Sequence, residues 1–146
     1  MKKILVYGLA TLFLIGCAVT PKSQHELENV VFIDTDTFDK DLSSSMAADT
    51  KAITVTMLAP MSINQMPTRL GKWLSAISDK DGRVDVEPKP TTTKSLSLML
   101  GLLPMAYNYL KEEFSYNSAS NYNATIFYNP KLGTVKKIVF TKKGNG

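Results

Sequence analysis

Apolar residues recur along this chain with two different periods, one typical of helices and one typical of strands. Phe38, Leu42 and Met46 are spaced by four residues and predict one face of a short helix. A longer stripe runs through residues 64–78. It consists of Met66, Leu70, Trp73, Leu74 and Ile77. We therefore expect two amphipathic helices that turn their apolar faces towards a sheet.

The start of the second helix is suggested by the residues that precede its stripe. Asn64 is suited to be an N-cap, and Pro67 would then lie in the first turn, where a missing N–H group is tolerated. Arg69 and Lys72 fall off the apolar stripe. Trp73 falls on it, so we interpret this side chain as a core residue rather than as a binding-site aromatic.

Three further segments have the pattern of strands. Residues 30–33 form a short apolar run. In residues 51–60, apolar side chains alternate with threonines, and we expect Pro60 to end this strand. Residues 84–86 place two valines around an aspartate, and Pro88 follows closely, which is typical of a short strand at a sheet edge.

The C-terminal segment predicts a β-hairpin. Residues 124–128 alternate as a strand does, residues 129–131 have good turn chemistry, and Gly133 can adopt positive φ before the return strand. Ile138 and Phe140 of that return strand should face the core. Together the elements predict a single small α+β domain, with helices packed on one face of a mostly antiparallel sheet and a C-terminal hairpin.

One segment, residues 95–110, is apolar on nearly all sides and contains no charge. A helix of this length would be about 24 Å long, which is shorter than the hydrocarbon thickness of a bilayer, and Pro104 would interrupt it. The favoured interpretation is a central core helix. A helix that faces a membrane or a partner protein is the alternative.

The N-terminal end has the order of features found in an export signal. Lys2 and Lys3 are followed by an apolar run over residues 4–15, which is too short to span a membrane. The run ends at Leu14-Ile15-Gly16-Cys17. This ending resembles the lipobox of bacterial lipoproteins, which implies cleavage after Gly16 and lipidation of Cys17, the only cysteine of the chain.

The resemblance divides the chain into three parts. Residues 1–16 would be a cleaved signal peptide, residues 17–29 an acylated tether, and residues 30–146 the α+β domain. Several long acyl chains on one residue should hold the protein to a membrane almost permanently. Because Ala18 rather than an aspartate follows the cysteine, the resemblance favours the outer membrane, with the domain facing the periplasm. The inner membrane and the cell surface are the alternatives.

Charge is distributed unevenly along the chain, although the formal net charge is only +4. Residues 18–50 contain seven acidic residues and two lysines, whereas residues 114–146 contain five lysines and no acidic residue. The two ends either lie close together and compensate, or the lysine-rich end meets anionic lipid or an acidic partner. The candidate interaction surface consists of Lys136, Lys137, Lys142 and Lys143.

Residue types that carry catalysis are scarce in the predicted domain. His25 is the only histidine and falls in the tether, and Cys17 would be acylated, so histidine- or cysteine-dependent catalysis and zinc binding lack their usual residues. The glycines stand singly, without a phosphate-binding loop. We therefore expect a protein that is not an enzyme, has no cofactor or metal, and does not bind nucleic acid.

The predicted membrane location and the scarcity of catalytic residue types together predict a class of function rather than a particular reaction. The preferred hypothesis is a periplasmic lipoprotein that acts as a non-enzymatic accessory, assembly or protein-binding factor of an envelope complex. One alternative is a lipid- or small-ligand-binding lipoprotein that uses residues 95–110. The other is a membrane-perturbing protein in which the same segment inserts beside the acyl anchor.

Overall fold

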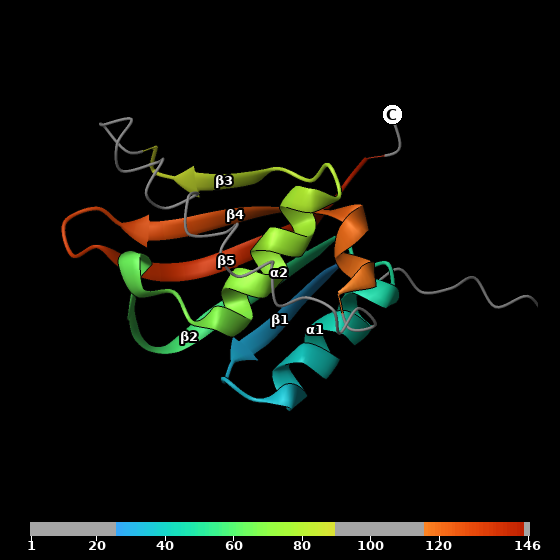
Figure 1. The fold of residues 1–146 in the computed structure, drawn as a ribbon, viewed down its shortest axis with the longest axis horizontal. Coiled ribbons are helices and arrows are strands. Elements are labelled where there is room, and N and C mark those ends of the chain that lie inside the picture. Colours follow the sequence, from blue (N-terminus) through green and yellow to red (C-terminus); the bar gives the residue numbers. More distant parts are fainter. Residues whose placement is uncertain (1–25, 90–115, 145–146) are drawn as a thin grey trace, which may run out of the picture.

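The computed structural model describes residues 26–89 and 116–144, which form a single sheet with helices in front of it (Figure 1). The strands are β1 (Leu27–Phe32), β2 (Ala52–Ser62), β3 (Val84–Glu87), β4 (Tyr122–Asn129) and β5 (Thr134–Lys142). The helices are α1 (Asp36–Ala47) and α2 (Thr68–Asp79), with short 3₁₀ turns η1 (Ile63–Gln65) and η2 (Asn117–Asn121). The predicted signal peptide, Cys17, His25 and the segment 95–110 lie outside the described residues.

The five strands are ordered β1-β2-β5-β4-β3 across the sheet. The strand β5 lies in the centre and is antiparallel to both of its neighbours, β2 and β4. The two outer pairs, β1–β2 and β3–β4, are parallel. The predicted α+β class and the C-terminal hairpin β4–β5 are therefore confirmed, and the parallel outer pairs make the sheet mixed.

The parallel pair β1–β2 explains the position of α1. Parallel neighbours cannot be joined by a tight turn, so the chain must return along the sheet, and here α1 forms the return. Its predicted apolar face, Phe38, Leu42 and Met46, is buried. Asp36 and Asp39 lie in its first turn, where the helix dipole favours negative charge.

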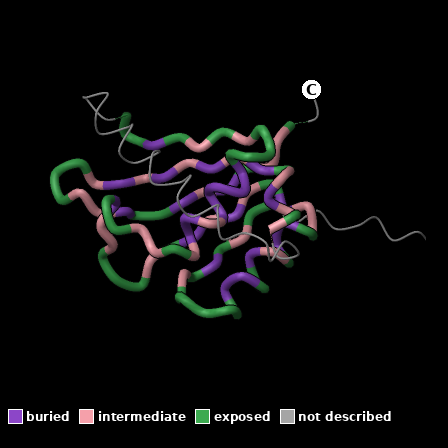
Figure 2. The backbone as a smooth tube through the Cα atoms, in the orientation of Figure 1, coloured by how far each residue is buried: buried purple, intermediate pink, exposed green. Residues whose placement is uncertain are grey.

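The core lies between the helices and the face of the sheet that they cover, as the buried segments in Figure 2 show. Strand alternation supplies one half of it, including Ile53 and Val55 from β2 and Ile138 and Phe140 from β5. Trp73 of α2 is fully buried in this layer, which confirms its prediction as a core residue. The opposite face carries Thr54, Thr56, Thr125 and Thr141, and no described helix packs on it.

Two predicted boundaries are wrong. Asn64 does not cap a helix; it lies in η1, its N–H group donates to Oγ of Ser62, and α2 begins four residues later with Pro67 at the N-cap position. Pro60 does not end β2, which continues to Ser62. The register with β5 shifts between Thr56 and Met61, and this irregularity accommodates a proline that donates no ladder hydrogen bond.

The domain also begins earlier than the predicted boundary at residue 30. Leu27, Glu28 and Asn29, which the sequence places in the tether, are the first residues of β1 and pair with β2. These three residues do not have the pattern of a buried strand, because the only buried residue of β1 is Val30, which follows them. The described part of the chain thus places a sheet edge directly after the segment that would carry the anchor.

Candidate functional site

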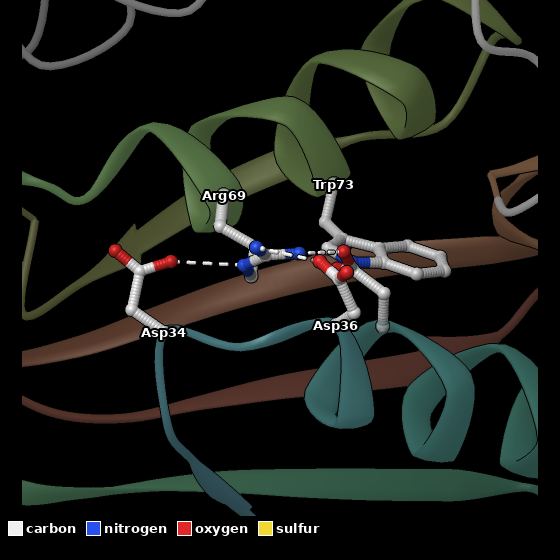
Figure 3. A network of polar contacts seen from close by, with 5 residues as sticks. Asp34, Asp36, Arg69 and Trp73 are labelled. Carbon is white, nitrogen blue, oxygen red and sulfur yellow. Dashed lines mark hydrogen bonds and ion pairs between the residues drawn. The ribbon is translucent and has the colours of Figure 1, made fainter.

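Arg69 is the centre of a cluster of charged residues between α1, α2 and the end of β1 (Figure 3). Its Nε donates to Oδ1 of Asp34 at 2.8 Å, and its Nη2 donates to Oδ1 of Asp36 at 3.1 Å. Its Nη1 donates to Oδ2 of Asp39. The guanidinium group therefore holds together the loop after β1 and the first turn of α1.

The carboxylate of Asp39 is the most enclosed member of this cluster. Its second oxygen, Oδ1, accepts a hydrogen bond of 2.8 Å from Nε1 of the buried Trp73. Each carboxylate oxygen of Asp39 therefore has a hydrogen-bond partner. A buried charge is strongly destabilising unless it is paired and hydrogen-bonded in this way. The rings of Trp73 and Tyr116 also meet edge to face, with centroids 4.6 Å apart, so the cluster continues into the core.

The electrostatics of the cluster favour a permanently charged guanidinium. Burial lowers the pKa of Arg69, but the hydrogen bond with Asp34, the charge of Asp39 and the hydrogen bonds with Asp36 and Asp39 outweigh burial, and the pKa is raised above its ordinary value. The donors of Arg69 are turned towards these carboxylates, so the cluster stabilises the fold rather than presenting a reactive group. Among the described residues, no group of His, Cys, Asp and Glu is arranged to hold a metal ion.

A pocket of about 400 Å³ lies on the other half of α1, where this helix passes β1. We call it the β1–α1 pocket. It is lined by Glu28, Asn29, Val30, Asp41, Ser44, Ser45 and Ala48. Strand residues form one wall and helix residues form the other, so the pocket runs beside the outer edge of the sheet.

The lining of the β1–α1 pocket is acidic. Glu28 and Asp41 carry negative charge, and no basic residue belongs to the lining. Oε2 of Glu28 lies 3.4 Å from Oγ1 of Thr50, a distance at the long limit for a hydrogen bond. The last turn of α1 contains no basic residue, so the negative end of the helix dipole adds to the field of the two carboxylates.

The acidic residues near the pocket also act on the buried side chain of Tyr122. Its hydroxyl lies 2.7 Å from the carbonyl oxygen of Thr50 and 3.3 Å from that of Met46. Burial, followed by the charges of Asp49 and Glu28, raises the pKa of Tyr122 to about 12. The phenol therefore remains a neutral donor that ties β4 to the end of α1.

The two edges of the sheet differ in how they are protected. Strand β3 is four residues long, carries exposed Asp85 and Glu87, and is followed by Pro88; shortness, charge and proline all discourage further strand pairing. Strand β1 is six residues long and has none of the prolines or lysines that protect an edge. Its Leu27 and Val31 are 76% and 45% exposed.

The predicted lysine surface is divided in the structure. Lys142 forms an ion pair of 2.9 Å with Asp49, and Nζ of Lys143 donates to the carbonyl oxygens of Lys80 and Ser120, both at 2.8 Å. Lys136 and Lys137 are exposed, and Nζ of Lys137 lies 4.9 Å from the ring centroid of Phe127. The Lys142–Asp49 pair joins the acidic and basic ends of the chain, as one of our two interpretations expects.

Neither the Arg69 cluster nor the β1–α1 pocket was predicted from the sequence. Arg69 was assigned only to the polar side of α2, and its three partners lie 30 to 35 residues before it. The four-residue spacing of Asp41 and Ser45 was available as a signal for one wall of the pocket. The other wall was hidden because residues 27–29 were assigned to the tether.

Comparison with protein-family models found no match, and comparisons with curated proteins and with solved structures found no significant similarity. Neither of the two described α-helices is long and apolar enough to cross a bilayer.

Proposed function

We propose that this protein is a lipid-anchored, non-enzymatic factor of the bacterial envelope that binds a protein partner. The resemblance of residues 14–17 to a lipobox supports an anchor at Cys17. On this proposal the acyl chains hold the protein to the outer membrane and the α+β domain faces the periplasm, where it contacts another component of an envelope complex.

The observation that carries the proposal is the β1–α1 pocket beside an edge of the sheet with which no described strand pairs. A pocket for a small molecule is commonly concave and mostly apolar, whereas this one is open, acidic and lined along one wall by consecutive strand residues. A strand edge offers a row of backbone donors and acceptors, which suits an extended polypeptide. The pocket therefore favours a protein partner over a lipid or a small apolar ligand.

The anchor is tested by metabolic labelling with radioactive palmitate. The wild-type chain should incorporate label and fractionate with membranes, and Cys17→Ser should do neither, because the chain contains no other cysteine. Sucrose-gradient separation of the two membranes then locates the labelled protein. An unlabelled wild-type chain would contradict the lipid anchor.

The partner is tested by photo-crosslinking in intact cells. A photoreactive amino acid at Asn29, on the outer edge of β1, should give a discrete crosslinked product that mass spectrometry identifies as an envelope protein. The same group at Asp85 on the β3 edge is the matched control and should not give this product. Absence of any product from position 29, or equal products from both edges, would contradict binding at β1.

A further inference from the structure

We propose that the β1–α1 pocket takes an extended segment of a partner protein by strand addition, and that this segment carries Lys or Arg at alternate positions. This inference rests on the proposed function and specifies its partner. The segment would extend the sheet by one strand beyond β1, with its basic side chains directed into the pocket and its intervening side chains on the open face of the sheet.

The backbone of β1 has the correct groups on its outer edge. In a parallel pair, alternate residues direct both N–H and C=O towards the partner strand. The N–H group of Ala52 donates to the carbonyl of Glu26, so the even-numbered residues of β1 face β2. The backbone groups of Leu27, Asn29 and Val31 therefore point outwards, and no described strand pairs with them.

Because side chains alternate along a strand, the added strand would have two faces that meet different surroundings. Glu28 and Val30 of β1 lie on the helix side, where they line the pocket, and Leu27 and Val31 are exposed on the open face. Successive side chains of the added strand would alternate in the same way. One set would meet the pocket, and the other would meet two exposed aliphatic side chains.

Charge selects the class of side chain that enters the pocket. The carboxylates of Glu28 and Asp41 and the C-terminal end of α1 all attract a cation, and the lining contains no base to compensate them. Exposed Asp41 is positioned on the helix wall, opposite the strand. A Lys or Arg side chain from the added strand would reach between the two walls. An acidic strand would be repelled.

The same charges disfavour a second copy of this chain as the occupant. If two β1 strands paired antiparallel about Asn29, the apolar side chain of Leu27 in each copy would lie opposite that of Val31 in the other. The interface would also bring together Glu28 and Asp41 from both copies, which are four carboxylates with no base among the lining residues. Like charges that face each other across a strand pair are destabilising, so a basic segment is favoured.

The test uses the full-length lipid-anchored protein in detergent micelles with two blocked peptides. In the first, Lys and Val alternate over the six-residue length of β1; in the second, Glu replaces Lys. Amide hydrogen exchange should slow at least about 10-fold at Leu27, Asn29 and Val31 with the Lys peptide, because new inter-strand hydrogen bonds protect these N–H groups. The Glu peptide should leave these rates unchanged.

Matched variants identify the charges responsible. The double variant Glu28→Gln/Asp41→Asn removes the two carboxylates of the pocket and should weaken binding of the Lys peptide about 10-fold or more, with a smaller salt dependence. The double variant Asp85→Asn/Glu87→Gln removes the same charge from the β3 edge and should bind as the wild type does. Asn29→Pro removes an outward N–H group and should also weaken binding.

Three results would overturn the inference. The first is an unchanged exchange rate at the three outward amides when the Lys peptide is bound. The second is equal binding of the Lys and Glu peptides. The third is protection of the same amides in the peptide-free protein, with a concentration-dependent dimer in sedimentation, which would make a second copy the occupant. Crosslinking from Asn29 in cells can succeed even if these fail, so the proposed function is judged separately.

Discussion

Nε1 of Trp73 donates a hydrogen bond of 2.8 Å to Oδ1 of Asp39, and both side chains are buried between the two helices. The bond joins α2 to the first turn of α1. Because Arg69 neutralises the same carboxylate from one turn earlier in α2, the two helices are linked through a charge that is satisfied on both oxygens. This arrangement fixes how α1 lies on the sheet, and hence the shape of the β1–α1 pocket.

Removal of Arg69 should be strongly destabilising. Arg69→Met leaves the buried carboxylate of Asp39 without its counter-charge, and we expect the free energy of unfolding to fall by about 2–4 kcal/mol. Urea denaturation monitored by Trp73 fluorescence measures the change. Asp36→Asn is the control; this carboxylate is 88% exposed, so its loss should cost well under about 1 kcal/mol. Equal losses in both variants would contradict the role given to Asp39.

Replacement of the indole should affect the cluster as well as the core. Trp73→Phe removes the donor to Asp39 and leaves a void, and should reduce the free energy of unfolding by about 2–4 kcal/mol. In a cycle with Asp39→Ala, which removes the acceptor, the two losses should not be additive, because each variant removes the same hydrogen bond. Because Trp73 is the only tryptophan, circular dichroism is the suitable probe. Strict additivity would show that the hydrogen bond contributes nothing.

Gly82 should not tolerate a side chain. A Cβ atom there would lie 2.6 Å from the carbonyl oxygen of Tyr122 and 2.7 Å from that of Ile77, and neither backbone atom can move freely. Gly82→Ala should therefore lower the unfolding free energy by about 1–3 kcal/mol, measured by urea denaturation. Gly144→Ala has open space around it and should be neutral. A stable Gly82→Ala variant would mean that the turn before β3 has room to move away from Ile77 and Tyr122.

Tyr122 should give the protein a specific weakness at alkaline pH. Its pKa is about 12 in the folded chain and near 10 in the unfolded chain, so below pH 10 both states keep the proton. Between pH 10 and 12 only the unfolded state loses it, and the unfolding free energy should fall by up to about 3 kcal/mol. Tyr122→Phe should be less stable at neutral pH by about 1 kcal/mol, but should lack this part of the alkaline decline.

Local sequence patterns predicted the elements whose structure depends on residues close together in the chain. The β4–β5 hairpin has an alternating strand, a turn and Gly133 at φ +64°, all of which can be read from adjacent residues. The apolar faces of α1 and α2 were predicted for the same reason. The start of α2 was harder to predict, because η1 at residues 63–65 uses the same capping chemistry as an α-helix and conceals where α2 begins.

Relationships between distant segments were not predictable from one sequence. Nothing local indicates that β1 and β2 are parallel, or that Asp34, Asp36 and Asp39 would meet Arg69, which follows them by 30 to 35 residues. The β1–α1 pocket depends on both the parallel pairing and the early start of β1, so it becomes visible only in three dimensions.

The central position of β5 has a consequence for biosynthesis. Strand β5 follows the other four described strands in the chain, yet it alone among them joins the pair β1–β2 to the pair β3–β4. Without residues 134–142, the described strands form two separate pairs with no ladder between them. The core therefore cannot close before β5 is available, and on the export that we propose above this delay would suit a polypeptide that is threaded unfolded through a translocation channel.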